Sequence, residues 1–194
     1  MAMPYGEHKQ LMLEALQREA DGQRALLAGD ETAGRAAMLA AAGLYRRSWE
    51  LASSTSYGRL VGALKAAIIG GDATELAGYA RTQIPDPPPS PPAAYVVALA
   101  ALAGGEDPTA AAASRLMREQ ASDAFVRAAD AVLALARGDA GAYALAVQAI
   151  VSDFESRDAF VTGVPIADTA LMFERLAQER EMRAGIESRL LPAG

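Results

Sequence analysis

The sequence predicts an all-α protein in which about nine helices form antiparallel hairpins that stack on one another. Three observations support this prediction. Alanine supplies 46 of the 194 residues, and alanine is the best helix former. The β-branched residues are sparse and do not alternate with polar residues over the length of a strand. A short glycine-acid signal separates alanine-rich stretches at four places along the chain.

This repeated signal predicts the end of one helix and the start of the next. A glycine in the left-handed conformation ends many helices, and an aspartate side chain can cap the free N–H groups of the helix that follows. The glycines of the signal are Gly29, Gly71, Gly105 and Gly138. The aspartates that we expect to be N-caps are Asp30, Asp72, Asp107 and Asp139.

The spacing of the signal indicates a repeat. Successive glycines are 42, 34 and 33 residues apart, and a period near 34 is typical of repeats built from two helices. The longer first interval contains a polar break at 53–58. The predicted helices are 5–28, 31–52, 57–70, 73–83, 93–104, 108–120, 123–137, 140–155 and 165–179, followed by an extended or turn segment at 181–191.

We interpret the whole chain, 1–194, as a single helical domain. Hairpins at 5–83 and 93–191 are joined by a proline-rich connector at 84–92, where the sequence reads IPDPPPSPP. Consecutive prolines favour an extended polyproline II conformation, which some peptide-binding grooves recognise. No basic residue lies beside these prolines, so we expect a stiff connector in which Ser90 caps the next helix.

Composition excludes several classes of site. The chain has no cysteine and one histidine, so disulfides, thiolate nucleophiles and transition-metal sites rich in nitrogen or sulfur are not expected. No phosphate loop, nucleophile elbow or dinucleotide fingerprint is present. We therefore assign no catalytic, cofactor-binding or metal-binding residue and expect no cofactor.

Charge and hydropathy also limit the partners. A net charge of −6 argues against nucleic-acid binding, which needs a basic surface. The longest apolar run, at 93–103, is far shorter than the roughly 20 residues of a membrane-spanning helix. The first residues also lack the pattern of a secretory signal. We expect a cytoplasmic protein that binds neither nucleic acid nor a membrane.

The first hairpin resembles a tetratricopeptide unit. Its sequence, ADGQRALLAGDETAGRAAMLAAA at 20–42, has small residues where that family needs close helix contact, namely Gly22, Gly34 and Ala41. The resemblance implies a tetratricopeptide-like α-solenoid. A compact helical bundle is the alternative.

The last third of the chain is similar to the C-terminal part of all-α immunity proteins from bacterial polymorphic toxin systems. The specific segments are VPIADTAL at 164–171 and IESRLLP at 186–192, within a resemblance of about 65 residues. The match departs from the family pattern after the last helix, where Glu181 replaces a glycine. The resemblance implies a protein that binds and blocks a toxin and has no catalytic residues.

These observations together favour a non-enzymatic protein–protein interaction module, with toxin neutralisation as a special case. Its partner would be another protein or a second copy of itself in a homodimer. Arginine and aromatic residues are enriched at interface anchors, and the residues that we expect at the partner surface are Tyr45, Arg46, Arg47, Trp49, Tyr79 and Arg81. For Tyr45 and Trp49, one helical turn apart, packing in the core is the other interpretation.

Two further functions remain open from the sequence. The first is a helical ligand-binding or enzymatic domain that uses arginines and carboxylates in a pocket. The second is a purely structural protein that associates with itself. Helical folds host all of these functions, so the fold alone does not decide among them.

Overall fold

The computed structural model describes residues 6–119 and 122–193, and within them every regular element is an α-helix. The predicted order of nine helices is confirmed for this part of the chain, although the predicted ends at 5 and 120 lie outside it. The helices are α1 (Glu7–Leu27), α2 (Glu31–Glu50), α3 (Gly58–Gly70), α4 (Thr74–Thr82), α5 (Pro91–Ala103), α6 (Asp107–Arg118), α7 (Asp123–Arg137), α8 (Ala140–Glu155) and α9 (Asp168–Gln178).

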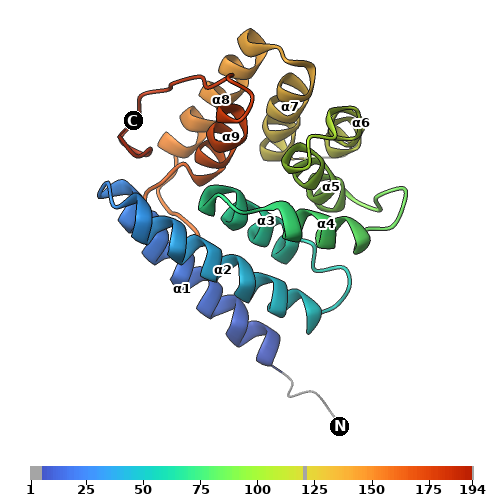
Figure 1. The fold of residues 1–194 in the computed structure, drawn as a ribbon, viewed down its shortest axis with the longest axis vertical. Coiled ribbons are helices and arrows are strands. Elements are labelled where there is room, and N and C mark those ends of the chain that lie inside the picture. The colour runs from blue at the N-terminus through green and yellow to red at the C-terminus, as the bar shows by residue number, and fades with distance from the viewer. Residues whose placement is uncertain (1–5, 120–121, 194) are drawn as a thin grey trace.

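Each helix packs against the next one along the chain, and α9 then returns to the N-terminal half. Figure 1 shows the α1–α2 hairpin on one side, α5 to α7 on the other, and α9 lying back toward α3. Contacts of α9 with both α3 and α8 close this path. Because most of its side chains are buried, α9 is a central element of the core.

Small residues bring α1 and α2 into the close contact that the sequence predicts. A Cβ atom added to Gly34 would lie 2.6 Å from Cγ of Leu26, and one added to Gly22 would lie 2.9 Å from Sδ of Met38. Real Cβ atoms do not approach other atoms so closely, so side chains at these two positions would push the helices apart. Ala41, the third predicted small residue, is fully buried.

The helix-ending role of the repeated glycines is confirmed, since all four have φ between 66° and 84°. Two of the expected aspartate caps are also confirmed. Oδ1 of Asp30 accepts a hydrogen bond from the N–H of Ala33 at 3.0 Å, and Oδ1 of Asp139 accepts one from Ala142 at 2.9 Å. Ser90 caps α5 in the same way, through the N–H of Ala93.

The other two aspartate caps were wrong. Helix α4 begins one residue later than the pattern implies, so Ala73 occupies its N-cap position and Asp72 lies outside the helix. In α6, Glu106 directly follows the left-handed glycine and takes the N-cap position, which makes Asp107 the first helical residue. Neither helix has a side-chain cap.

The C-terminal tail determines where α9 begins. The sequence predicts a helix opened by Pro165, but α9 starts at Asp168. The N–H of Ala167 donates to the carbonyl of Leu190 at 2.8 Å, which joins the start of α9 to the tail. The two segments of the immunity-protein resemblance are therefore adjacent in space. Glu181, which replaces the expected glycine, still adopts a positive φ of 56°.

The two confirmed and two failed caps give a matched test. Replacing Asp139 by alanine removes the hydrogen bond to Ala142 and should lower the free energy of unfolding by about 0.5–2 kcal/mol. Replacing Asp72 by alanine removes no cap and should change it by less than about 0.5 kcal/mol. Urea unfolding of both variants measures the difference, and equal effects would contradict these cap assignments.

Candidate binding site

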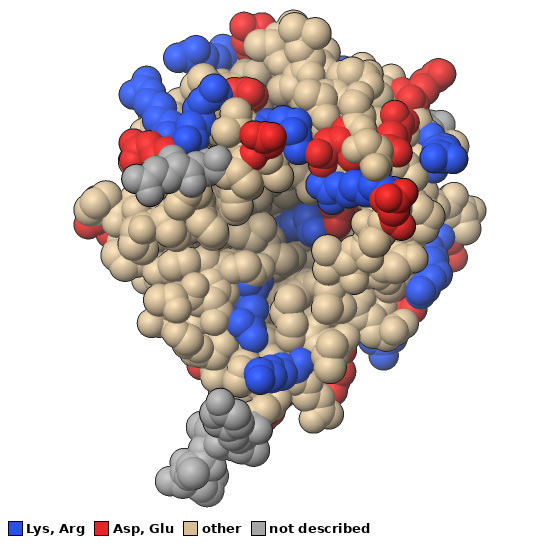
Figure 2. All heavy atoms as spheres, turned by 180° about the vertical axis from the view of Figure 1, so that it is seen from behind, with Lys and Arg blue, Asp and Glu red and all other residues tan. Residues whose placement is uncertain are grey.

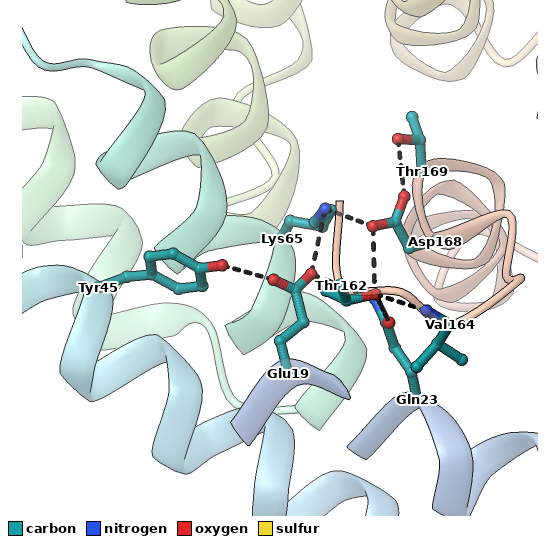
Figure 3. Close-up of polar contacts among 8 residues, drawn as sticks. All are labelled: Glu19, Gln23, Tyr45, Lys65, Thr162, Val164, Asp168 and Thr169. Atoms are coloured by element: carbon teal, nitrogen blue, oxygen red, sulfur yellow. Dashed lines mark hydrogen bonds and ion pairs between the residues drawn. The ribbon is translucent and has the colours of Figure 1, made fainter. Parts of the chain in front are cut away.

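A buried ion centre joins three helices that are far apart in the sequence. Nζ of Lys65, on α3, lies 3.2 Å from Oε1 of Glu19 on α1 and 2.5 Å from Oδ2 of Asp168 on α9. The side chain of Lys65 is 20% exposed, and that of Glu19 is 2% exposed. Figure 3 shows the two carboxylates on either side of the ammonium group. We call this cluster the ion centre.

Neighbouring polar groups complete the ion centre. The hydroxyl of Tyr45 donates to Oε2 of Glu19 at 2.6 Å, and the amide of Gln23 donates to both carboxylates. The hydroxyl of Thr162 in turn donates to Oε1 of Gln23. A buried charge is tolerated when it is paired and hydrogen-bonded in this way.

The electrostatics of the ion centre fix its protonation. Burial alone lowers the pKa of Lys65, but the carboxylates of Asp168 and Glu19 outweigh it and hold this pKa above its ordinary value. Burial, together with the charge of Glu19, raises the pKa of Tyr45. Lys65 is therefore an ammonium and Tyr45 a neutral hydrogen-bond donor at physiological pH. An amine nucleophile needs the opposite shift, toward the neutral form.

A groove lies beside the ion centre. Its first part, the lysine pocket, has a volume of about 210 Å³. Its second part, the aromatic pocket, has a volume of about 130 Å³. Both are lined by Phe154, Arg157 and Thr169, so they adjoin. The lysine pocket is also lined by Lys65, Phe160, Val161, Thr162, Val164, Ile166 and Asp168. The aromatic pocket is also lined by Tyr95, Ala124, Phe125, Arg127, Ala128, Ile150 and Asp153.

Charged and aromatic side chains meet at the rim of the groove. Arg127 and Arg157 both bind the carboxylate of Asp153, each with a shortest N–O distance of 2.5 Å. The guanidinium of Arg157 also lies 3.7 Å from the centre of the Phe154 ring, a cation–π contact. Figure 2 shows that the face opposite Figure 1 is hollowed near its centre, with basic and acidic side chains in the hollow.

Tyr95 on α5 supplies a polar group to the aromatic pocket. Its ring packs edge-on against Phe125, with the ring centres 6.0 Å apart. The residue is only 8% exposed, yet its hydroxyl makes no hydrogen bond within the described residues. Burial raises its pKa, so the hydroxyl is neutral. Buried hydroxyl groups usually have a partner, which makes this one a candidate contact for a ligand.

The largest cavity, of about 740 Å³, lies instead between α9 and the C-terminal tail. Many polar groups near it already pair with one another. Glu174 accepts hydrogen bonds from the Tyr143 hydroxyl and from the N–H groups of Ala184 and Gly185. Arg175 pairs with Glu31. These contacts fasten the tail to the helices, and we therefore place the candidate site at the smaller groove.

Two of the residues predicted for a partner surface were wrong. Tyr45 is 2% exposed and Trp49 is 5% exposed. Tyr45 is drawn into the core by Glu19, and Trp49 stacks on Tyr57 with ring centres 5.7 Å apart. At their positions on α2 the side chains face the neighbouring helices, so the core interpretation of the aromatic pair holds.

The remaining predicted residues are accessible but do not form the groove. The guanidinium of Arg46 lies 4.1 Å from the centre of the Tyr79 ring and also pairs with Glu50 and Glu75. Arg81 pairs with Glu106 at 3.0 Å. Arg47 is exposed. The structure thus brings Arg46 and Tyr79 together and leaves this surface apart from the groove-lining residues.

Sequence reasoning missed the groove because its walls come from distant segments. Tyr95, Phe125 and Phe154 are about 30 residues apart in sequence, on three helices. The sequence did flag the cluster of Asp153 and Arg157, but as a solvated helix end. One signal was available, since Lys65 is the single charge in the apolar segment 60–70, a position that calls for a buried counter-charge.

No family model matches the chain, and neither the curated proteins nor the solved structures contain a significant match to it. In the described part of the chain, no cluster of three or more histidine, cysteine or acidic side chains is arranged to hold a metal ion. None of the described helices combines the length and the apolar character that a membrane span requires.

The burial of Trp49 leads to a direct test. Replacing Trp49 by alanine should lower the free energy of unfolding by about 3–5 kcal/mol, because it removes a large buried ring. Replacing the exposed Arg47 by alanine should change it by no more than about 0.5 kcal/mol. Thermal and urea unfolding measure both variants, and a small effect at Trp49 would place that residue at the surface after all.

Proposed function

We propose that the protein is a non-enzymatic binding module whose partner, another protein, is held at the groove. One observation carries this proposal: aromatic side chains, two arginines and a buried hydroxyl without a partner line a single hollow on the surface. Aromatic and arginine side chains in such desolvated pockets provide much of the binding energy at protein interfaces.

The state of the ion centre favours this proposal over an enzymatic one. Lys65 is held in its charged form, and the hydroxyl of Tyr45 is committed to Glu19. A general base or nucleophile requires a group whose pKa is shifted toward the reactive form. In this centre the shifts run the other way and favour a structural role, which supports binding without chemistry.

The resemblances seen in the sequence narrow the proposal. The sequential packing of the helices is the arrangement expected of a tetratricopeptide-like protein, with the return of α9 as an addition. The two segments similar to immunity proteins meet at the start of α9, next to Asp168 and Thr169 of the groove. Neutralisation of a bacterial toxin in the cytoplasm is therefore the specific form of the proposal.

Affinity capture with a blocked groove tests the proposal. Ala124 is exposed and lines the aromatic pocket, so replacing it by tryptophan should fill the mouth without disturbing the core. Ala36, exposed on α2, is the matched control position for the same substitution. The wild-type protein and both variants are immobilised at equal density, exposed to an extract of the cells that make the protein, and checked for unchanged melting.

We expect one protein to be retained by the wild type and by Ala36→Trp, and to be lost with Ala124→Trp. The captured protein, once purified, should bind the wild type with the same dependence on position 124, and a toxin should lose its activity in the complex. Identical retention by all three columns, or no retention by any, would contradict a partner site at the groove.

A further inference from the structure

The groove exposes hydrogen-bond donors that the protein itself does not satisfy. The Tyr95 hydroxyl makes no hydrogen bond within the described residues. An ammonium group has three N–H donors, and the printed partners of Lys65, Glu19 and Asp168, account for two of them. An occupant that satisfies both Tyr95 and Lys65 must therefore carry hydrogen-bond acceptors.

The carboxylates around the groove are already engaged as acceptors. Oδ1 of Asp153 accepts from Arg127, and its Oδ2 accepts from Arg157. Oδ2 of Asp168 accepts from Lys65, and its Oδ1 accepts from the hydroxyl of Thr169. A cationic ligand would have to compete with these contacts.

The local charges also permit an anion, despite the net charge of −6 for the whole chain. In and beneath the groove, three cations balance three carboxylates. The cations are Lys65, Arg127 and Arg157, and the carboxylates are Glu19, Asp153 and Asp168. An entering carboxylate thus meets donors without a local excess of negative charge, and charge-assisted hydrogen bonds are the stronger kind.

The two pockets differ in what they can hold. The aromatic pocket, at about 130 Å³, is close in size to a cavity of about 150 Å³ that holds a benzene ring. Its walls include the apolar side chains of Phe125, Ile150 and Phe154. The adjoining lysine pocket contains the charged group. The pair therefore suits a ring-sized apolar group that is covalently close to a carboxylate.

We propose that the groove binds the C-terminal residue of the partner polypeptide, with an apolar side chain in the aromatic pocket and the terminal carboxylate beside Lys65 and Arg157. In a C-terminal residue a single Cα carries both groups, so both pockets can be filled at once. An aspartate or glutamate side chain ends at its carboxylate and has no apolar group to offer. This inference rests on the proposed function, since it names the part of the partner that enters.

Two small probes separate the carboxylate from the ring. N-acetyl-L-phenylalanine reproduces a C-terminal phenylalanine, and N-acetyl-L-phenylalanine amide is its neutral counterpart. Titrated into the purified protein and followed by NMR, the acid should bind at least about tenfold more tightly than the amide, because only the acid accepts charge-assisted hydrogen bonds. Equal affinities for the two probes would overturn the assignment of a carboxylate.

Matched tyrosine variants locate the probe. Tyr95→Phe removes the unpartnered hydroxyl and keeps the ring, and should weaken binding of the acid about fivefold to tenfold. Tyr57→Phe is the control, because Tyr57 is also 8% exposed and makes no printed hydroxyl hydrogen bond, but does not line the groove. Binding that is unchanged in Tyr95→Phe would overturn the proposed site.

A third probe identifies the source of the carboxylate. N-acetyl-Ala-Ala-Phe, with a free C-terminus, should bind at least as tightly as N-acetyl-phenylalanine, since its preceding residues leave through the mouth of the groove. Binding of phenylacetate without binding of the tripeptide would overturn the proposal in favour of a small metabolite. Failure of all probes, alongside a captured partner that depends on position 124, would reject this inference and leave the proposed function standing.

Discussion

The ammonium group of Lys65 is the point on which the arrangement of the helices depends. It is the meeting place of α1, α3 and α9, through Glu19 and Asp168. A partly buried ammonium is stable only with counter-charges in contact, so the first residue of α9 is fixed beside α3 although about 100 residues separate them in sequence. The rest of α9 then lies in the core, where Phe173 and Met172 are fully buried. The ion centre thereby turns a run of sequential hairpins into a closed structure.

The groove is a consequence of the same closure. Thr169 directly follows Asp168 and lines both pockets, while the segment between α8 and α9 forms one wall of the lysine pocket. The aromatic pocket exists because α5, α7 and α8 approach one another beside this fixed start of α9. Binding and stability are therefore coupled here: the residues that would contact a partner are held in place by the residues that hold α9.

Local physical chemistry was enough to predict the helices, and long-range packing was not. The glycines at helix ends and the caps at Asp30 and Asp139 depend on neighbouring residues alone, and these predictions were confirmed. The cap at Asp72 failed because a shift of one residue in the helix start, set by tertiary packing, moves the aspartate out of position. The groove brings together side chains from four helices and a connecting segment, and no local pattern specifies that meeting.

A double-mutant cycle between Lys65 and Asp168 tests the role of the ion centre most directly. The free energies of unfolding of the wild type, Lys65→Gln, Asp168→Asn and the double variant would be measured in urea. If the ammonium holds α9 in place, the two changes are coupled by about 1.5–3 kcal/mol, because either one alone leaves a charge without its partner. Additive effects, with a coupling below about 0.5 kcal/mol, would mean that α9 docks by apolar packing alone and would contradict the account.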